Sequence, residues 1–175
     1  MQIHSSSVLQ YPRSRVFSAF RDEMPAVAPY MPNIQEILVK AREVNGPATK
    51  MHNEWVGKGD IPKVAQGIIK PEMLRWDDFA EWNADTFACV WSLKLRVFTD
   101  KVKCTGRTVL EEQGANATRI TLSGTLDLDL RDIPGVPRLL AGTLAPQVEK
   151  FVVALVRPNL EQMNTAIGRY LDAHG

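Results

Sequence analysis

The stretch RITLSGTLDLDL, residues 119–130, alternates polar and apolar positions almost without interruption. Every second residue from Arg119 onward is polar, and the residues between them are isoleucine, leucine or a single glycine. A period of two places all the apolar side chains on one face of a β-strand. That face needs a cover, and a helical pattern follows from about Pro137. The two segments together predict an antiparallel sheet that grips a C-terminal helix.

The chain before this stretch predicts six more strands. We expect them at residues 2–10, 34–44, 49–56, 73–82, 87–97 and 102–110. The turns between most of them are short, and Asn45-Gly46-Pro47 is a strong turn signal. Consecutive strands joined by short turns are typical of an antiparallel meander. The expected sheet therefore has seven strands.

Helical spacing predicts two kinds of helix. A short amphipathic helix is expected over residues 12–23, where Pro12 fits the first position, with one more turn at 27–30. The main helix is expected to begin near Leu144, because Pro146 suits a first turn, and to run to the end of the chain. Pro158 lies inside that pattern and is expected to kink or split the helix.

Composition sets limits on the class of protein. The chain has 175 residues, of which 45% are hydrophobic and 23% charged, so we expect one domain over residues 1–175. A net charge of +1 gives no electrostatic argument for binding nucleic acid. We see neither a secretory signal nor an apolar run long enough to insert stably in a membrane, and two cysteines are too few for a disulfide scaffold. These features predict a cytoplasmic protein.

Charged residues support the predicted strand order. The acids expected on the outer face are Asp77, Asp78, Glu81, Asp127 and Asp129, and the bases on the strands between them are Lys94, Arg96, Lys101, Lys103 and Arg107. In a meander the basic strands then lie between the acidic ones, which favours cross-strand ion pairs. The Asp127-Leu128-Asp129 sequence is therefore interpreted as a solvated face and not as a metal site.

Three segments carry a resemblance to a known superfamily: residues 11–17 with Phe20, the entry into the second strand at residues 30–34, and the final strand and helix. On these the chain resembles the START-like, Bet v 1-like superfamily (SRPBCC, or polyketide cyclase-like), and is similar to its uncharacterised bacterial branches. The resemblance implies an α+β helix-grip fold, with a curved seven-stranded antiparallel sheet around a long C-terminal helix and two short helices after the first strand. It also implies a hydrophobic cavity between sheet and helix. Members bind lipids, sterols, polyketides or plant hormones, and some catalyse cyclisation or hydrolysis.

Aromatic residues on neighbouring strands are the candidate ligand site. The predicted cavity-lining residues are Trp55, Trp76, Phe87, Trp91, Leu122, Leu126, Phe151 and Leu155. Aromatic walls with a few polar groups are typical of ligand pockets, although the same residues are also typical of an ordinary core. Asn53, Thr108 or Thr143 would orient a ligand.

Other chemistry-bearing residues have plainer interpretations. His52 and Glu54 share one face of a strand, where an acid–base pair is possible, but a solvated surface pair is the expectation. Cys89 and Cys104 lie on apolar faces and are expected to be inert buried thiols. Nucleotide-binding, hydrolase and zinc-protease motifs are absent from the sequence. We predict no catalytic residue, no metal and no cofactor.

The sequence therefore predicts binding or transport of an apolar small molecule or lipid, without catalysis. Two alternatives stay open. One is a cyclase- or hydrolase-type enzyme in the same cavity, with His52 or an inward acid such as Asp78 as general base. The other is an interaction module whose own side chains fill the core. Residues 60–71 are either a gate over the cavity mouth or an ordinary covering loop.

Overall fold

The computed structural model describes residues 1–59, 61, 66, 70–96, 101–129 and 138–174, with the backbone alone for 138–144. Its strands are β1 Gln2–Leu9, β2 Ile34–Asn45, β3 Ala48–Gly57, β4 Arg75–Asn83, β5 Ala88–Leu95, β6 Val102–Glu112 and β7 Thr118–Leu128. Its helices are α1 Arg13–Asp22, α2 Met24–Val27 and α3 Arg138–His174, with single 3-10 turns at η1 Ala28–Tyr30 and η3 Pro71–Met73. Most of residues 60–71, which are predicted to be either a gate or a covering loop, lie outside the described residues.

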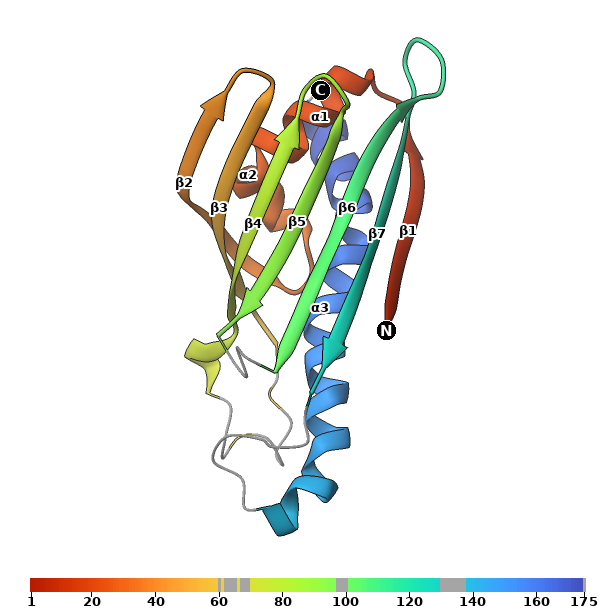
Figure 1. Ribbon diagram of the computed structural model, residues 1–175. Helices are drawn as coiled ribbons and strands as arrows, with labels where there is room; N and C mark the ends of the chain where they lie inside the picture. The colour runs from red at the N-terminus through yellow and green to blue at the C-terminus, as the bar shows by residue number, and fades with distance from the viewer. Residues whose placement is uncertain (60, 62–65, 67–69, 97–100, 130–137, 175) are drawn as a thin grey trace.

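The seven strands form one antiparallel sheet in the order β1-β7-β6-β5-β4-β3-β2. Strands β2 to β7 follow one another as the short turns predict, and β1 pairs with β7 at the far edge. Figure 1 shows α3 lying along one face of this curved sheet, with α1 and α2 beside its C-terminal end. The predicted helix-grip architecture is confirmed.

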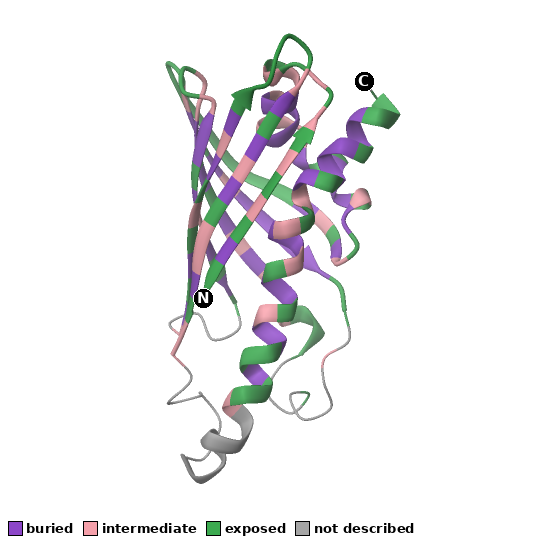
Figure 2. Cartoon of the chain, turned by 90° about the vertical axis from the view of Figure 1, so that its right-hand side faces the viewer, coloured by how far each residue is buried: buried purple, intermediate pink, exposed green. Residues whose placement is uncertain are grey.

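Burial follows the alternation of the strands. Along β4, Trp76, Asp78, Ala80 and Trp82 are buried, whereas Phe79 is 44% exposed. The same banding of buried and exposed positions is visible along neighbouring strands in Figure 2. The apolar face of the sheet packs on α3, so the period-two pattern of the sequence decides which side chains are buried in the core.

The prediction that Asp78 faces outward is therefore wrong. Asp77 and Asp78 are consecutive on β4, and consecutive strand residues point to opposite faces. Asp77 remains on the outer face, where its Oδ1 lies 2.7 Å from Nε2 of His52. Asp78 lies on the inner face with the two tryptophans of β4, Trp76 and Trp82.

Helix α3 begins earlier than the sequence predicts. It starts at Arg138, so Pro146 lies inside the helix and costs it one backbone hydrogen bond. Pro158 also lies inside, and the helix is not split there. The side-chain amide of Asn159 donates to the Leu155 carbonyl at 2.7 Å, which supports the backbone next to the position where the proline lacks a donor.

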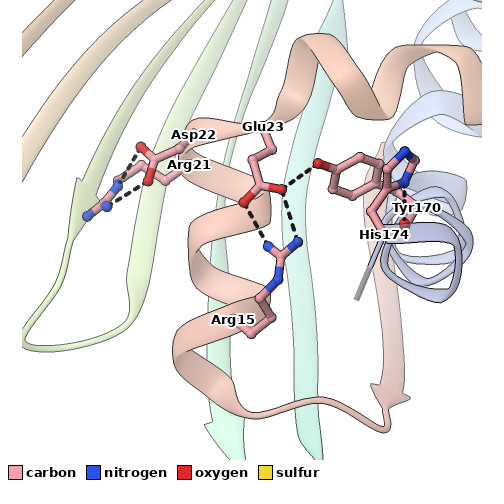
Figure 3. A network of polar contacts seen from close by, with 6 residues as sticks. All are labelled: Arg15, Arg21, Asp22, Glu23, Tyr170 and His174. Carbon is pink, nitrogen blue, oxygen red and sulfur yellow. Dashed lines mark hydrogen bonds and ion pairs between the residues drawn. The ribbon is translucent and has the colours of Figure 1, made fainter.

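A network of polar contacts joins α3 to the first helices (Figure 3). Glu23 accepts two hydrogen bonds from the Arg15 guanidinium, at 2.7 and 3.1 Å, and one from the Tyr170 hydroxyl at 2.6 Å. The Tyr170 ring stacks on His174 with 4.7 Å between centroids. Because hydrogen bonds to a charged group are stronger than neutral ones, this network fastens the end of α3 to the segment after α1.

Replacing Tyr170 by phenylalanine should lower the free energy of unfolding by about 1–2 kcal/mol, because it removes one hydrogen bond to a charged carboxylate and keeps the ring. Urea unfolding followed by circular dichroism measures this change. Tyr11→Phe is the matched control, since its hydroxyl donates to Asp172 on the same helix but in an exposed position. Equal effects of the two substitutions would contradict a fastening role for the Glu23 network.

Candidate functional site

A pocket lies between the inner face of the sheet and the middle of α3, with a cavity volume of about 50 Å³. The described residues that line it are Phe20, Met24, Asn53, Trp55, Trp76, Asp78, Ala80, Trp82, Cys89, Trp91, Leu93, Thr108, Val156, Asn159, Leu160 and Met163. They come from α1, α2, β3 to β6 and α3. The site is therefore assembled from segments far apart in the sequence by the wrapping of the sheet around the helix.

The walls of the pocket contain all four tryptophans of the chain. Trp55 and Trp76 are direct partners across β3 and β4, and their rings stack with 5.9 Å between centroids. Trp82 lies further along the inner face of β4. Aromatic surface of this extent favours an apolar or cationic ligand. Because all four tryptophans line the pocket, tryptophan fluorescence reports on this site alone.

Trp91 is held in place by two glycines. Trp91, Gly106 and Gly124 form one row across β5, β6 and β7, since each is paired with the next. A Cβ atom on Gly124 would lie 2.7 Å from the Trp91 indole, and one on Gly106 would overlap the same ring. The indole therefore lies on the bare backbone of both glycines, which no larger residue would permit.

The polar end of the pocket is a carboxyl–amide pair. Asp78 and Asn53 are direct partners across β3 and β4, and Asn53 Nδ2 donates to Asp78 Oδ2 at 3.1 Å. Burial raises the pKa of Asp78 to about 6, while the Asn53 amide, the nearby Trp55 indole and the charge of His52 pull that pKa back down. Asp78 is thus a buried acid whose charge the protein compensates only in part.

Three buried polar atoms of the lining have no hydrogen-bond partner among the described residues: Asn53 Oδ1, Asn159 Oδ1 and Trp55 Nε1. The amide orientations are set by their other ends, because Asn53 Nδ2 donates to a carboxylate and Asn159 Nδ2 donates to a carbonyl. Both unpaired amide atoms are therefore acceptors. The indole N–H of Trp55 lies near Asp78 without hydrogen-bond geometry.

The structure places three of the eight predicted lining residues at this pocket, namely Trp55, Trp76 and Trp91. Phe87 is not among the described lining residues, and it precedes β5 in a turn with φ of 48°. There it packs on Phe17 and lies under the Arg13 guanidinium. Its predicted place in the strand is wrong, since a left-handed residue interrupts the alternation.

Four predicted lining residues are buried but lie outside the described lining: Leu122, Leu126, Phe151 and Leu155. The two leucines on β7 flank Gly124, where the Trp91 indole covers the inner surface. Leu155 lies near Gly57 at the end of β3, and Phe151 is one turn earlier on α3. Their contact with a ligand stays a prediction.

His52 and Glu54 lie on the outer face of β3 and do not pair with each other. His52 pairs with Asp77 and stacks on Phe79. Glu54 is 5% exposed, not solvated as predicted, because the Arg75 and Arg96 guanidiniums lie against it. Burial acts to raise the Glu54 pKa, but these cations and Lys40 outweigh it and the pKa is lowered. Neither residue reaches the pocket.

The two thiols are buried, as predicted. Burial raises the pKa of Cys104 to about 12, and burial together with the Asp78 charge raises that of Cys89 further. A thiol in such surroundings is not a nucleophile at neutral pH. In the part of the chain that is described, no group of three or more histidine, cysteine or acidic residues is placed to hold a metal ion.

Of the three polar residues predicted to orient a ligand, Asn53 and Thr108 line the pocket, and the side chain of Thr143 lies outside the described residues. The Thr108 hydroxyl accepts the Trp91 indole N–H at 3.2 Å. Asn159 was not predicted. A signal for it exists, because it is a polar residue within the apolar stripe of α3, four residues after Leu155.

Comparison with solved structures defines the fold. The protein TTHA0849 from Thermus thermophilus matches with a TM-score of 0.68 and 21% identity, over 100% of this chain and 99% of that one. The Zhui aromatase/cyclase from Streptomyces sp. R1128 matches with a TM-score of 0.64 and 12% identity, over 100% and 96%. Ara h 8.0201 matches with a TM-score of 0.51 and 15% identity, over 98% of each chain.

The chain thus has the START-like, Bet v 1-like helix-grip fold, as the sequence resemblance implies. No protein-family model matches the sequence, and no curated protein does. Identities this low speak for the fold alone. In the described part of the chain, no helix is both long and apolar enough to cross a membrane.

Proposed function

We propose that this protein binds an apolar small molecule or lipid in the pocket between the sheet and α3. The observation that carries the proposal is the set of unpaired polar atoms inside an aromatic wall. Asn53 and Asn159 are 4% and 2% exposed, and each leaves an amide oxygen without a partner among the described residues. A buried acceptor without a partner costs about 1–3 kcal/mol, and a ligand with suitable donors offsets that cost.

The small size of the cavity favours the alternative of an interaction module with a filled core, whereas the buried polar residues of the lining argue against it. The cavity of about 50 Å³ has room for only a few water molecules, far below the roughly 300–1,000 Å³ of typical ligand pockets. Side chains thus fill most of the space in this conformation. A core selected only for packing would place apolar residues at positions 53, 78 and 159, because each buried polar group is costly.

Asp78 favours one second candidate, an enzyme that transfers a proton in the pocket. A buried carboxyl with a pKa of about 6 suits a general acid or base near neutral pH. His52, the alternative base, is on the opposite face of the sheet. The two candidate functions differ in what happens to the ligand. A protein that only binds the ligand releases it chemically unchanged, whereas an enzyme converts it.

Titration with 1-hexanol, followed by tryptophan fluorescence, tests the binding function. We expect a saturable change in emission with one molecule bound, because all four tryptophans line the pocket. Ala80→Leu should weaken binding at least about tenfold by filling the pocket from β4. Glu81→Leu is the matched control, since it adds the same side chain one residue along on the exposed face. Unchanged affinity in correctly folded Ala80→Leu protein would contradict the proposed site.

A further inference from the structure

We propose that the ligand carries a protonated amine, which binds to the polar side chains of the pocket lining, Asp78, Asn53 and Asn159. This inference rests on the proposed function, because it names the chemical class of the guest in the same pocket. It depends on three features of the described lining: its free acceptors, its uncompensated negative charge and its aromatic walls.

The free polar atoms of the pocket are mainly acceptors. Asn53 Oδ1 and Asn159 Oδ1 have no partner among the described residues, and the Asp78 carboxyl accepts the Asn53 amide at Oδ2 and lies near the Trp55 indole N–H. The available donors are the Trp55 indole N–H and the hydroxyl hydrogen of Thr108. An ammonium group offers two or three donors and accepts none, so it suits a lining whose free polar atoms are mainly oxygens.

The charge of the lining selects between ligand classes. Asp78 is the one ionisable side chain other than Cys89 among the described lining residues, and lysine, arginine and histidine are absent from that set. The arginines of this region, Arg75 and Arg96, lie on the outer face with Glu54. A carboxylate or phosphate headgroup would meet an acid with no cation among the described lining residues to neutralise it, which is strongly unfavourable in a buried site.

The aromatic walls are also suited to a cation. Indole rings attract cations through their quadrupole more strongly than other aromatic side chains do, and the attraction increases when the pair is desolvated. Four indoles around one carboxyl therefore favour an ammonium over a neutral group of the same size. A neutral alcohol satisfies one acceptor at most and gains little from the Asp78 charge.

Three compounds with the same six-carbon body separate these classes: hexylammonium, 1-hexanol and hexanoate. Binding to the wild-type protein at pH 8 is measured by calorimetry and by tryptophan fluorescence. We expect hexylammonium to bind at least about tenfold more tightly than 1-hexanol, and hexanoate more weakly than 1-hexanol. In Asp78→Asn protein the advantage of the ammonium should disappear, while 1-hexanol binding remains.

The matched control is Asp77→Asn, which removes a carboxylate one residue away on the outer face of the same strand. It should leave the ammonium preference unchanged. A second readout needs no substitution: at pH 4.5, where Asp78 is largely protonated, the wild-type preference should shrink. The titratable groups near Asp78 are His52 on β3 and Cys89 on β5, and the lining residues of α3 are uncharged.

The possible results separate this inference from the proposed function. Equal affinity for hexylammonium and 1-hexanol in the wild type overturns the inference and leaves the binding function standing. An ammonium preference that survives Asp78→Asn also overturns it, because the cation then binds elsewhere. If no hexyl compound changes the tryptophan emission, both the binding function and the inference fail.

Discussion

Replacing Gly106 by alanine should lower the free energy of unfolding by about 3 kcal/mol or more. The added Cβ would lie 2.5 Å from the Ser123 carbonyl oxygen and would overlap the Trp91 indole. Overpacking of a core costs about 1–3 kcal/mol where side chains can adjust, and here one of the two obstacles is backbone of the paired strand. Urea unfolding measures the change, and tryptophan emission should shift because Trp91 must move.

Gly59→Ala is the matched control for this substitution. Gly59 follows β3, and no atom of the described residues lies within 4 Å of a Cβ atom added there. We expect a change below about 0.5 kcal/mol, as for most surface substitutions. If Gly106→Ala were as harmless as Gly59→Ala, the Trp91 indole would not lie on the glycine row, and the described wall of the pocket would be wrong.

Replacing Asp78 by asparagine should raise the free energy of unfolding by about 3 kcal/mol at pH 8 in the absence of ligand. Burial raises the pKa of Asp78 to about 6, whereas an unfolded chain holds an aspartate near pKa 4, and each pKa unit is worth about 1.4 kcal/mol. Asparagine has the same shape and keeps an oxygen to accept the Asn53 amide. Unfolding at several pH values measures the difference.

The sign of this effect depends on pH. A raised pKa means that the folded state binds the proton more tightly than the unfolded state, so the wild type loses stability as pH rises from about 4 through about 6. The difference between Asp78→Asn and wild type should therefore be near zero at pH 4 and complete above pH 7. Asp77→Asn should not show this profile. A difference that is constant with pH would contradict a buried, ionising Asp78.

An ionising acid in a core that would be more stable without it is typical of a functional site. The two large predictions thus address different parts of one pocket. Gly106 and Trp91 form an aromatic wall, and Asp78 supplies a charge that the described protein groups compensate only in part.

Much of the fold is determined by local sequence patterns. The period of two in residues 119–130 predicts β7 to within two residues at its C-terminal end, and the short turns predict the order of β2 to β7. The helical spacing after Pro137 predicts α3 but not its start, because Pro146 is tolerated inside the helix. These patterns succeed because periodicity is a property of neighbouring residues and needs no knowledge of distant contacts.

The site was predicted only in part, because periodicity does not describe contacts between distant segments. Its tryptophans are conspicuous in the sequence, and three of the four were predicted to line a cavity. Asp78 was placed on the wrong face, although Trp76, Ala80 and Trp82 at even spacings already show which face is inward. Phe87 was placed in a strand that a left-handed turn residue interrupts.

The sequence by itself determined the class of fold and the side chains available for the core. Only the tertiary structure decided which residues lie together: Asn53 opposite Asp78 through the register of β3 and β4, the Trp91 indole on a row of glycines, and Asn159 of α3 in the same pocket lining. Strand register and helix docking depend on contacts between segments distant in the chain, and local periodicity carries no information about those contacts.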